Sequence, residues 1–304
     1  MAFKFSLIVP TMNAGEKWVR WIDAWRAQDL RPESVLILDS SSEDETASIA
    51  ADAGFRVVSL DRRQFSHGGT RQAGLELVPY TEIICFLTQD AILAHPSSLL
   101  NLVSAFEDPE VGAAYGRQIP HLGAGPLESF PRLFNYPPES SVRKLDDAGI
   151  LGIKVTFLSN SFAAYRREAL QGVSGFPRHT ILGEDTYVAA KLLLAGWKIA
   201  YCAGASVYHS HDYTLLQEFK RSFDIGVFHN REKWMIQQFG GAGGEGFRYV
   251  KSELAYLKSE SLQLVVLSVV RSLVRFLGYQ LGRAEAALPN AIKRAVSMHA
   301  GYWE

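Results

Sequence analysis

Apolar and polar positions in the first half of the chain form alternating blocks that predict strands and helices in turn. Short apolar runs predict strands at residues 6–9, 35–38, 55–60, 83–87 and 111–115. Apolar residues every three or four positions predict helices at residues 16–28, 46–50, 69–78 and 97–106. We therefore expect an α/β fold whose strands are joined by right-handed crossovers around a parallel core.

The alternation stops between residues 118 and 153. Prolines recur through this stretch, at Pro120, Pro126, Pro131, Pro137 and Pro138. The pattern predicts a long irregular segment, and such a segment inside a compact domain is usually functional.

Regular patterns return beyond this segment. They predict a strand at residues 156–165, a helix at 184–194 and two short strands at 198–201 and 206–209. From about residue 213 onward the pattern is helical. We expect one domain over residues 1–212, followed by a C-terminal helical extension over residues 213–304.

The apolar residues of that extension concentrate in residues 262–277, with Arg271 and Arg275 inside the run and Arg283 after it. Three roles fit this pattern: a packed C-terminal helix, a dimer helix, and a helix lying in the plane of a membrane surface with its basic residues toward anionic lipid. Core or dimer packing is favoured, because a helix that is apolar on nearly every side is usually buried.

Composition narrows the class of protein. The 304 residues carry a formal net charge of −1, which gives no overall attraction to nucleic acid. Cys85 and Cys202 lie in apolar surroundings, which predicts reduced thiols and no disulfide. The N-terminal residues lack a secretory signal pattern, and no run of about 20 uncharged apolar residues predicts a spanning helix. We expect a cytoplasmic enzyme.

Polar residues follow three of the predicted strands at the point where each strand ends. Pro10 and Thr11 end the first strand, Asp39 ends the second, and Asp90 follows the apolar run 83–87. The carboxyl ends of parallel strands meet at one edge of a sheet, where open α/β folds bind ligands. Asp39 could bond a base or ribose there, or it could form an Asx-type turn with its own backbone.

Asp90 places a carboxylate directly after a central strand, which is costly unless a cation or donors meet it. A divalent ion bridging Asp90 to a diphosphate would satisfy this carboxylate, whereas a helix-capping aspartate is the structural alternative. His209 and His211 follow a late strand and could supply nitrogen ligands to the same ion. Their spacing matches no self-contained zinc site.

Glu184 and Asp185 stand where a helix is expected to begin, after Gly183. Carboxylates at a helix N-terminus form either a solvated first turn or a general base. The helix dipole is expected to keep Asp185 ionised and so to limit any rise in its pKa.

A basic cluster of Arg62, Arg63, His67 and Arg71 surrounds two glycines, which favours an anion site at a helix N-terminus, with a solvated basic loop as the alternative. Arg71 is the better candidate for contact with an anion, because it lies in the first turn of the predicted helix.

Several sequence patterns of other enzyme classes are absent. The chain has no G-x-G-x-x-G after its first strand, no G-x-x-x-x-G-K-[ST] and no G-x-S-x-G. These absences argue against a dinucleotide-dependent dehydrogenase, a phosphate-loop enzyme and an α/β-hydrolase.

In order along the chain, these motifs closely resemble those of inverting family-2 glycosyltransferases with the GT-A fold, and the finer pattern is similar to bacterial rhamnosyltransferases of that family. The resemblance covers roughly residues 4–230. The motifs are Ser6-Leu7-Ile8-Val9-Pro10-Thr11, Asp39-Ser40-Ser41-Ser42-Glu43-Asp44-Glu45-Thr46, Phe65-Ser66-His67-Gly68-Gly69-Thr70-Arg71, Phe86-Leu87-Thr88-Gln89-Asp90-Ala91, Gly183-Glu184-Asp185 and Tyr208-His209-Ser210-His211.

The resemblance implies a GT-A type mixed, mostly parallel sheet flanked by helices, and it assigns roles to residues. Asp185 corresponds to the catalytic base, with Glu184 beside it. Asp90 corresponds to the last aspartate of a D-x-D motif that holds Mg²⁺ or Mn²⁺, and His209 and His211 are further candidate ligands. Nucleotide-sugar contacts are expected from Pro10, Thr11, Asn13, Asp39, Arg71, Thr88, Gln89 and Asp90.

The chain departs from the D-x-D motif at its first position, where Thr88 replaces an aspartate. Threonine is a poor substitute for a carboxylate ligand, so the ion would bind weakly or depend on a histidine.

By resemblance, we expect inverting transfer of L-rhamnose from dTDP-rhamnose to a hydroxyl of a glycan or lipid-linked glycan, in bacterial cell-surface polysaccharide synthesis. The segment 118–153 is expected to contact this acceptor. The protein would then be cytoplasmic or peripheral on the inner face of the cell membrane.

Two alternatives stay open at this point. A sugar nucleotidyltransferase would need a glycine-rich turn after the first strand, where this chain has Pro10-Thr11-Met12-Asn13. A non-catalytic carbohydrate-binding or scaffolding relative is favoured by Thr88 and opposed by the intact Glu184-Asp185 pair.

Overall fold

The computed structural model describes residues 3–241 and 244–303. A central mixed sheet with the order β3-β2-β1-β4-β8-β6-β9-β5 carries β7 against β9. The strands are β1 (Phe5–Thr11), β2 (Ser34–Asp39), β3 (Arg56–Ser59), β4 (Ile83–Leu87), β5 (Ile92–Leu93), β6 (Val111–Ile119), β7 (Ser141–Arg143), β8 (Phe162–Arg166) and β9 (Lys198–Tyr208).

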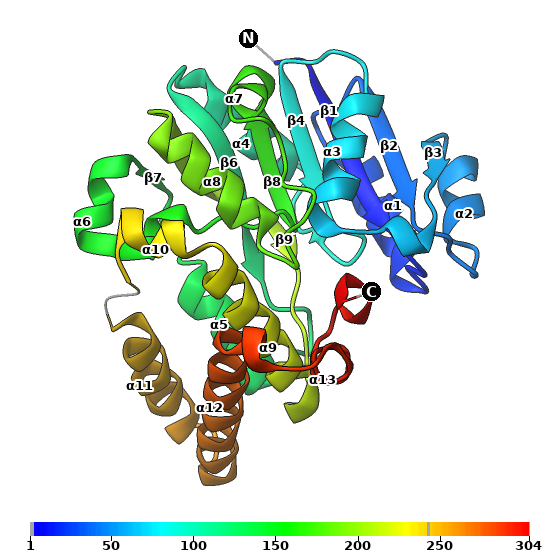
Figure 1. The fold of residues 1–304 in the computed structure, drawn as a ribbon. Coiled ribbons are helices and arrows are strands. Elements are labelled where there is room, and N and C mark those ends of the chain that lie inside the picture. Colours follow the sequence, from blue (N-terminus) through cyan, green and yellow to red (C-terminus); the bar gives the residue numbers. More distant parts are fainter. Residues whose placement is uncertain (1–2, 242–243, 304) are drawn as a thin grey trace.

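Helices cover both faces of the sheet and extend beyond one edge of it (Figure 1). They are α1 (Lys17–Arg26), α2 (Thr46–Asp52), α3 (His67–Leu77), α4 (Ser98–Val103), α5 (Pro126–Asn135), α6 (Ala148–Leu151), α7 (Arg167–Gly172), α8 (Glu184–Leu194), α9 (Leu215–Arg231), α10 (Lys233–Phe239), α11 (Glu245–Lys258), α12 (Leu262–Arg283) and α13 (Asn290–Val296).

The core has two layers because successive side chains of a strand point to opposite faces. In β1, Leu7 and Val9 pack with the helices α1, α2 and α4 on one face. Ile8 packs on the other face with residues of α3, α7, α8 and α9. Trp18 and Trp21 of α1 are fully buried, so this helix is a core element.

The α/β class with flanking helices is confirmed, and its parallel pairings are concentrated in one half of the sheet. β3, β2, β1 and β4 are parallel neighbours, and β6 pairs in parallel with β9. β8 runs antiparallel to both β4 and β6, so it enters the sheet from the opposite end. The parallel core is therefore the part β3-β2-β1-β4 of a mixed sheet, and a mixed sheet is what the family resemblance implied.

Three local predictions were wrong. The segment 118–153 is not irregular: it contains α5, which begins at Pro126, where proline suits the first helical turn. The strand predicted at 156–165 is only Phe162–Arg166, because residues up to Thr156 form a 3-10 turn. The two short strands at 198–209 are one strand, β9, whose pairing with β6 is interrupted by a register shift.

The helical extension after residue 213 is confirmed, and part of it belongs to the main core. Phe223 and Phe228 of α9, and Trp303 near the C-terminus, pack with the core on the α8 face of the sheet. The boundary between residues 212 and 213 stays a prediction.

Helix α12 packs on α9 through glycines on both helices, where an added Cβ at Gly226, Gly278 or Gly282 would collide with the other backbone. The opposite side of α12 is exposed along its length, so core packing was the wrong expectation for that side. By length and hydropathy α12 could cross a membrane, although only 17% of its most apolar window is buried inside the protein. Its outward residues include Leu262, Val266, Leu273, Phe276 and Leu277.

Candidate active site

The register of the sheet brings distant chain segments to one edge. Thr11 of β1 pairs with Asp39 of β2, and β4 ends beside them before Asp90. β6 and β9 run in the same direction as β4 and end at this edge, whereas β8 begins there, because Phe162 pairs with Leu87. The helices α5, α9 and α12 lie beyond the same edge (Figure 1).

Asp90, His209 and His211 form a cluster at this edge, with one ligand atom from each lying within 4.8 Å of the others. The Nε2 atoms of His209 and His211 lie 3.3 and 3.9 Å from Oδ2 of Asp90. Burial lowers the pKa of both imidazoles, and that of His211 falls to about 3. Asp90 is more than a hundred positions from the two histidines in the sequence, yet the fold brings the three residues together.

Polar neighbours orient two members of the cluster. The hydroxyl of Thr88 donates a 2.7 Å hydrogen bond to Oδ1 of Asp90. Burial raises the pKa of the Asp90 carboxyl, but the bonds from His209 and Thr88 outweigh this effect and hold that pKa well below its usual range. Gln118 Oε1 lies 2.8 Å from Nδ1 of His209. The hydroxyl of Thr88 therefore positions the carboxylate of Asp90.

Asp185 lies in the first turn of α8, where it is partly exposed. Its Oδ2 accepts a hydrogen bond from the backbone N–H of Asn160 at 3.1 Å, and its Oδ1 accepts from Thr186 N–H at 2.8 Å. Burial and the neighbouring charge of Glu184 raise the pKa of Asp185 to about 6. The backbone bonds from Asn160 and Thr186 at the helix N-terminus lower the pKa of Asp185 and so limit the rise, but burial and the adjacent negative charge outweigh them.

Glu184 differs from Asp185 although the two are adjacent. Its side chain is buried, and its Oε1 lies 3.1 Å from a guanidinium nitrogen of Arg71 and 3.0 Å from Nδ2 of Asn160. Burial raises the pKa of Glu184, but Arg71 and His67 outweigh it and lower the pKa overall. These contacts suit a residue that positions Arg71 and Asn160, and the catalytic assignment of Glu184 stays a prediction.

Arg71 is also buried, and its partner is Glu184. The first turn of α3 places it there, but the structure shows an internal ion pair where the sequence suggested an exposed anion site. Contact between Arg71 and a donor diphosphate stays a prediction.

A chain of hydrogen bonds joins the cluster to the catalytic candidate. Gln118 bonds His209 through Oε1 and donates through Nε2 to the hydroxyl of Ser159 at 2.9 Å. The next residue, Asn160, bonds Asp185 and Glu184. Asp90 and Asp185 therefore share one supporting network, and the prediction that they face a single hollow stays a prediction.

The residues expected to hold the nucleotide lie at strand ends and in loops that hydrogen bonds connect to one another. Thr11 Oγ1 donates to Asp39 Oδ1 at 3.1 Å, and Ser42 N–H donates to Asp39 Oδ2 at 2.9 Å. Asp39 therefore bonds its local backbone, as the alternative held, but three residues on and not two as in an Asx turn. Asn13 has a positive φ of 48° and accepts from Glu43 N–H at 2.8 Å.

Gln89 bonds both backbone groups of Met12, at 2.7 and 3.0 Å, and so ties this loop to the strand end beside Asp90. Pro10 is the residue of β1 just before this region. Contact of these residues with a nucleotide stays a prediction.

Sequence reasoning missed Asn160 and Gln118. Asn160 lies where β8 begins, and a search for polar residues at the carboxyl ends of strands cannot find it. Gln118 lies inside β6, in a segment that the sequence pattern did not extend into a strand. Their side chains are buried and hydrogen-bonded, which only the sheet register shows.

The C-terminal segment also reaches this region. Ser297 Oγ and Met298 N–H donate to the carboxylate of Asp224 on α9, at 2.7 and 2.9 Å. This anchor places His299 against His67, with ring centroids 4.8 Å apart. No sequence signal identified this contact.

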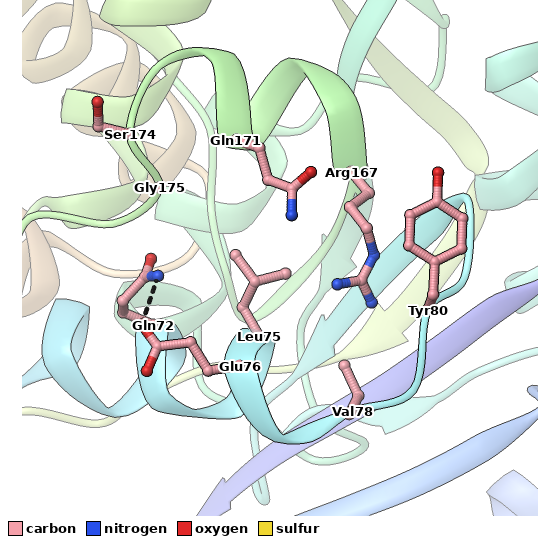
Figure 2. A pocket seen from close by; sticks show the side chains of 9 residues that line it. All are labelled: Gln72, Leu75, Glu76, Val78, Tyr80, Arg167, Gln171, Ser174 and Gly175. Carbon is pink, nitrogen blue, oxygen red and sulfur yellow. Dashed lines mark hydrogen bonds between the residues drawn. The ribbon is translucent and has the colours of Figure 1, made fainter.

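A separate cavity of about 550 Å³ lies between α3 and α7 (Figure 2). It is at the opposite end of the strands, because Tyr80 precedes β4 and Arg167 follows β8. Arg167 donates there to the carbonyls of Thr81 and Pro79. None of the predicted site residues lines this cavity, so it is distinct from the candidate active site.

Similar proteins share both the sequence and the fold. Residues 6–173 match the family described as glycosyl transferase family 2. The O-antigen chain rhamnosyltransferase RfbN of Salmonella typhimurium is 46% identical over 301 residues, which are 99% of this chain and 96% of that protein. The O-antigen chain rhamnosyltransferase WbaN of Salmonella anatum is 46% identical over 300 residues, covering 98% and 95%.

Solved structures confirm the GT-A fold. The mannosyltransferase PcManGT of Pyrobaculum calidifontis, solved with GDP-Man and Mn²⁺, gives a TM-score of 0.62 at 18% identity, covering 100% of this chain and 85% of that one. S. aureus TarS 1-349 gives a TM-score of 0.58 at 17% identity, covering 96% and 86%. By the family match and by the two full-length relatives, the chain belongs to glycosyl transferase family 2.

Proposed function

We propose that this glycosyltransferase moves L-rhamnose from dTDP-L-rhamnose to a hydroxyl of a glycan acceptor, with inversion at the anomeric carbon. Full-length similarity to two O-antigen chain rhamnosyltransferases supports the sugar. The geometry of Asp185 carries the chemistry, because it is a partly exposed carboxylate held by two backbone donors with a pKa raised to about 6.

The acceptor hydroxyl would lose its proton to Asp185 as its oxygen attacks the anomeric carbon. The bond from that carbon to the diphosphate breaks in the same step, and the electron pair leaves with the diphosphate. A carboxylate with a raised pKa is a better base near neutral pH than an ordinary aspartate. Two hydrogen bonds fix its orientation, and Asn160 holds it relative to the buried Arg71–Glu184 pair.

A divalent ion fits Asp90, His209 and His211 by their chemistry. Gln118 lies 2.8 Å from Nδ1 of His209 and holds the ring so that its Nε2 faces the carboxylate of Asp90. One carboxylate oxygen and two imidazole nitrogens suit Mn²⁺ better than Mg²⁺, which prefers oxygen. When bound, the ion would neutralise the departing diphosphate.

Other classes of function have less support. A sugar nucleotidyltransferase has no use for a base held as Asp185 is, and the turn after β1 lacks the glycines that a triphosphate would require. A carbohydrate-binding relative without catalysis was suggested by Thr88, but Thr88 orients Asp90. Its presence therefore does not indicate a lost metal site.

The acceptor is proposed to be a lipid-linked glycan, and the exposed side of α12 to lie against the membrane surface. That side has no acidic residue, while Arg271 and Arg275 turn inward to pair with Glu218. Exposed Lys251 and Lys258 on the neighbouring α11 could meet anionic lipid. The protein would then be cytoplasmic and peripheral on the inner face of the membrane. A homodimer through the same face is the competing arrangement.

The proposed reaction is tested by incubating the purified protein with Mn²⁺ and dTDP-L-rhamnose, UDP-glucose or GDP-mannose, and measuring nucleoside diphosphate release with and without a glycan acceptor. Release from dTDP-L-rhamnose that exceeds release from the other donors supports the proposal. The product linkage, determined by NMR, must be inverted relative to the donor. A preference for another donor, or retention of configuration, would overturn it.

A further inference from the structure

Two arginines beside the Asp90–His209–His211 cluster have no acidic partner. Arg132 lies on α5 and Arg221 on α9. Neither guanidinium forms a hydrogen bond or an ion pair within residues 3–241 and 244–303, and the Nε atom of Arg132 is buried without any partner. Nothing in the sequence had singled out either residue.

Both arginines lie close to the cluster. The guanidinium of Arg221 lies 5.8 Å from the ring centroid of Tyr213, and that ring stacks on His211 with centroids 5.0 Å apart. Arg132 is one helical turn after Glu128, which accepts a hydrogen bond from Ser210, the residue between the two histidines. After burial and His209, the charges of Arg132 and Arg221 also contribute to the lowered pKa of His211.

The carboxylates on the same two helices are already engaged. Glu128 of α5 bonds Ser210, and Asp224 of α9 bonds the C-terminal segment. Glu218 of α9 pairs with arginines of α12. The helices therefore offer no spare carboxylate to Arg132 and Arg221, although each is near at least one in sequence.

Arg132 is half-buried and Arg221 is exposed, and both differ from two buried arginines that have acidic partners. Arg71 pairs with Glu184, and Arg271 pairs with Glu218. The buried Nε of Arg132 carries the cost of an unsatisfied donor. An anion bound there would accept from this donor and could also meet the exposed guanidinium of Arg221.

We propose that Arg132 and Arg221 bind a diphosphate group beside the Asp90–His209–His211 cluster, an inference that rests on the proposed transfer from a nucleotide sugar. Guanidinium groups present planar forks of donors that match phosphate oxygens, and a diphosphate offers enough oxygens for both. The diphosphate has two sources in this reaction: the donor nucleotide and the linker of a lipid-linked acceptor.

The test uses Arg132→Gln and Arg221→Gln, with Lys220→Gln as the matched control. Lys220 precedes Arg221 on α9 and points about 100° away around the helix axis. Calorimetric titration with inorganic diphosphate, with and without Mn²⁺, measures binding directly. Each arginine variant is expected to weaken binding by roughly tenfold or more, since a lost charge-assisted bond has that effect. Lys220→Gln and the wild type should agree.

Kinetics then separate the two sources. If the donor supplies the diphosphate, both arginine variants lose affinity for dTDP and raise KM for the donor, while KM for the acceptor is unchanged. If the acceptor supplies it, dTDP binding is unchanged, and KM rises for a diphosphate-linked acceptor but not for the same sugar on an alkyl glycoside. Either pattern supports the diphosphate site.

The inference is overturned if the wild type does not bind inorganic diphosphate, or if both arginine variants bind it as tightly as the wild type. Arg221→Lys guards against a folding artefact, since it keeps the charge and should recover only part of the affinity. The test of this site does not depend on which sugar is transferred. If the protein transfers another sugar and the arginine variants still lose diphosphate binding, the diphosphate site stands and only the rhamnosyl assignment is wrong.

Discussion

The carboxylate of Glu184 lies 3.1 Å from a guanidinium nitrogen of Arg71, and 5–6% of each side chain is exposed. The pair joins the first turn of α3 to the first turn of α8, next to the residue proposed as the base. A buried pair of this kind is costly to break, because the remaining partner is left as an uncompensated charge.

Arg71→Met is therefore expected to lower the free energy of unfolding by about 3–5 kcal/mol. Arg178→Met is the control, since Arg178 pairs with Glu76 at a distance of 2.8 Å but both side chains are half-exposed. That change should cost about 1 kcal/mol or less. Urea unfolding followed by circular dichroism measures both, and equal losses in the two variants would contradict the structural role of the Arg71–Glu184 pair.

Asp185→Asn is expected to reduce transfer by roughly 10³-fold, because the amide cannot accept the acceptor proton. The amide is nearly the same size as the carboxylate, so dTDP should bind as in the wild type. Turnover and dTDP affinity are measured on the same preparation. Near-normal turnover in Asp185→Asn would refute its assignment as the base.

The rate should also report the raised pKa of Asp185. The base is active when ionised. As the pH drops below this pKa of about 6, kcat/KM should therefore fall by about tenfold per pH unit. Glu184, Arg71, Tyr136 and Tyr165 are among the charged or titratable groups that interact with this carboxyl.

Glu184→Gln removes a negative charge that raises this pKa, so the acid limb should move to lower pH. If the acid limb of the kcat/KM profile stays at the same pH or moves to higher pH in Glu184→Gln, another group controls that limb.

The proposed metal site predicts a graded loss of Mn²⁺ binding. Asp90→Ala removes a ligand and should abolish measurable binding. Thr88→Val removes only the hydroxyl that orients Asp90, and outer partners of this kind change affinity by roughly 10–100-fold. Titration with Mn²⁺ alone, followed by electron paramagnetic resonance, measures free ion directly. Unchanged binding in both variants would exclude Asp90 as a ligand.

The exposed side of α12 predicts binding to lipid vesicles. The double variant Leu273→Gln/Phe276→Gln replaces two outward residues that are 58% and 57% exposed, so the fold should tolerate it. Flotation with vesicles containing anionic lipid should recover the wild type and lose the variant. Sedimentation velocity without lipid addresses the alternative: a dimer in the wild type that becomes a monomer in the variant, without flotation of either, would favour a second copy as the partner.

The sequence alone determined much of the fold and of the site. Continuous apolar runs predicted the strands whose ends carry Thr11, Asp39 and Asp90, because the carboxyl ends of parallel strands share an edge. The Gly183-Glu184-Asp185 motif also predicted where α8 begins, since glycine and acidic residues favour the start of a helix. These signals are local, so they can be read without knowing which segments meet.

The tertiary structure decided what depends on long-range pairing. The antiparallel entry of β8 brings Asn160 to the edge where the other strands end, and β6 brings Gln118 there. Sequence periodicity describes which residues form a strand, but not its direction in the sheet. For the same reason only the structure showed Glu184 bound to Arg71, and Arg132 close to Arg221: the distances between their charges follow from the packing of helices that lie far apart in the chain.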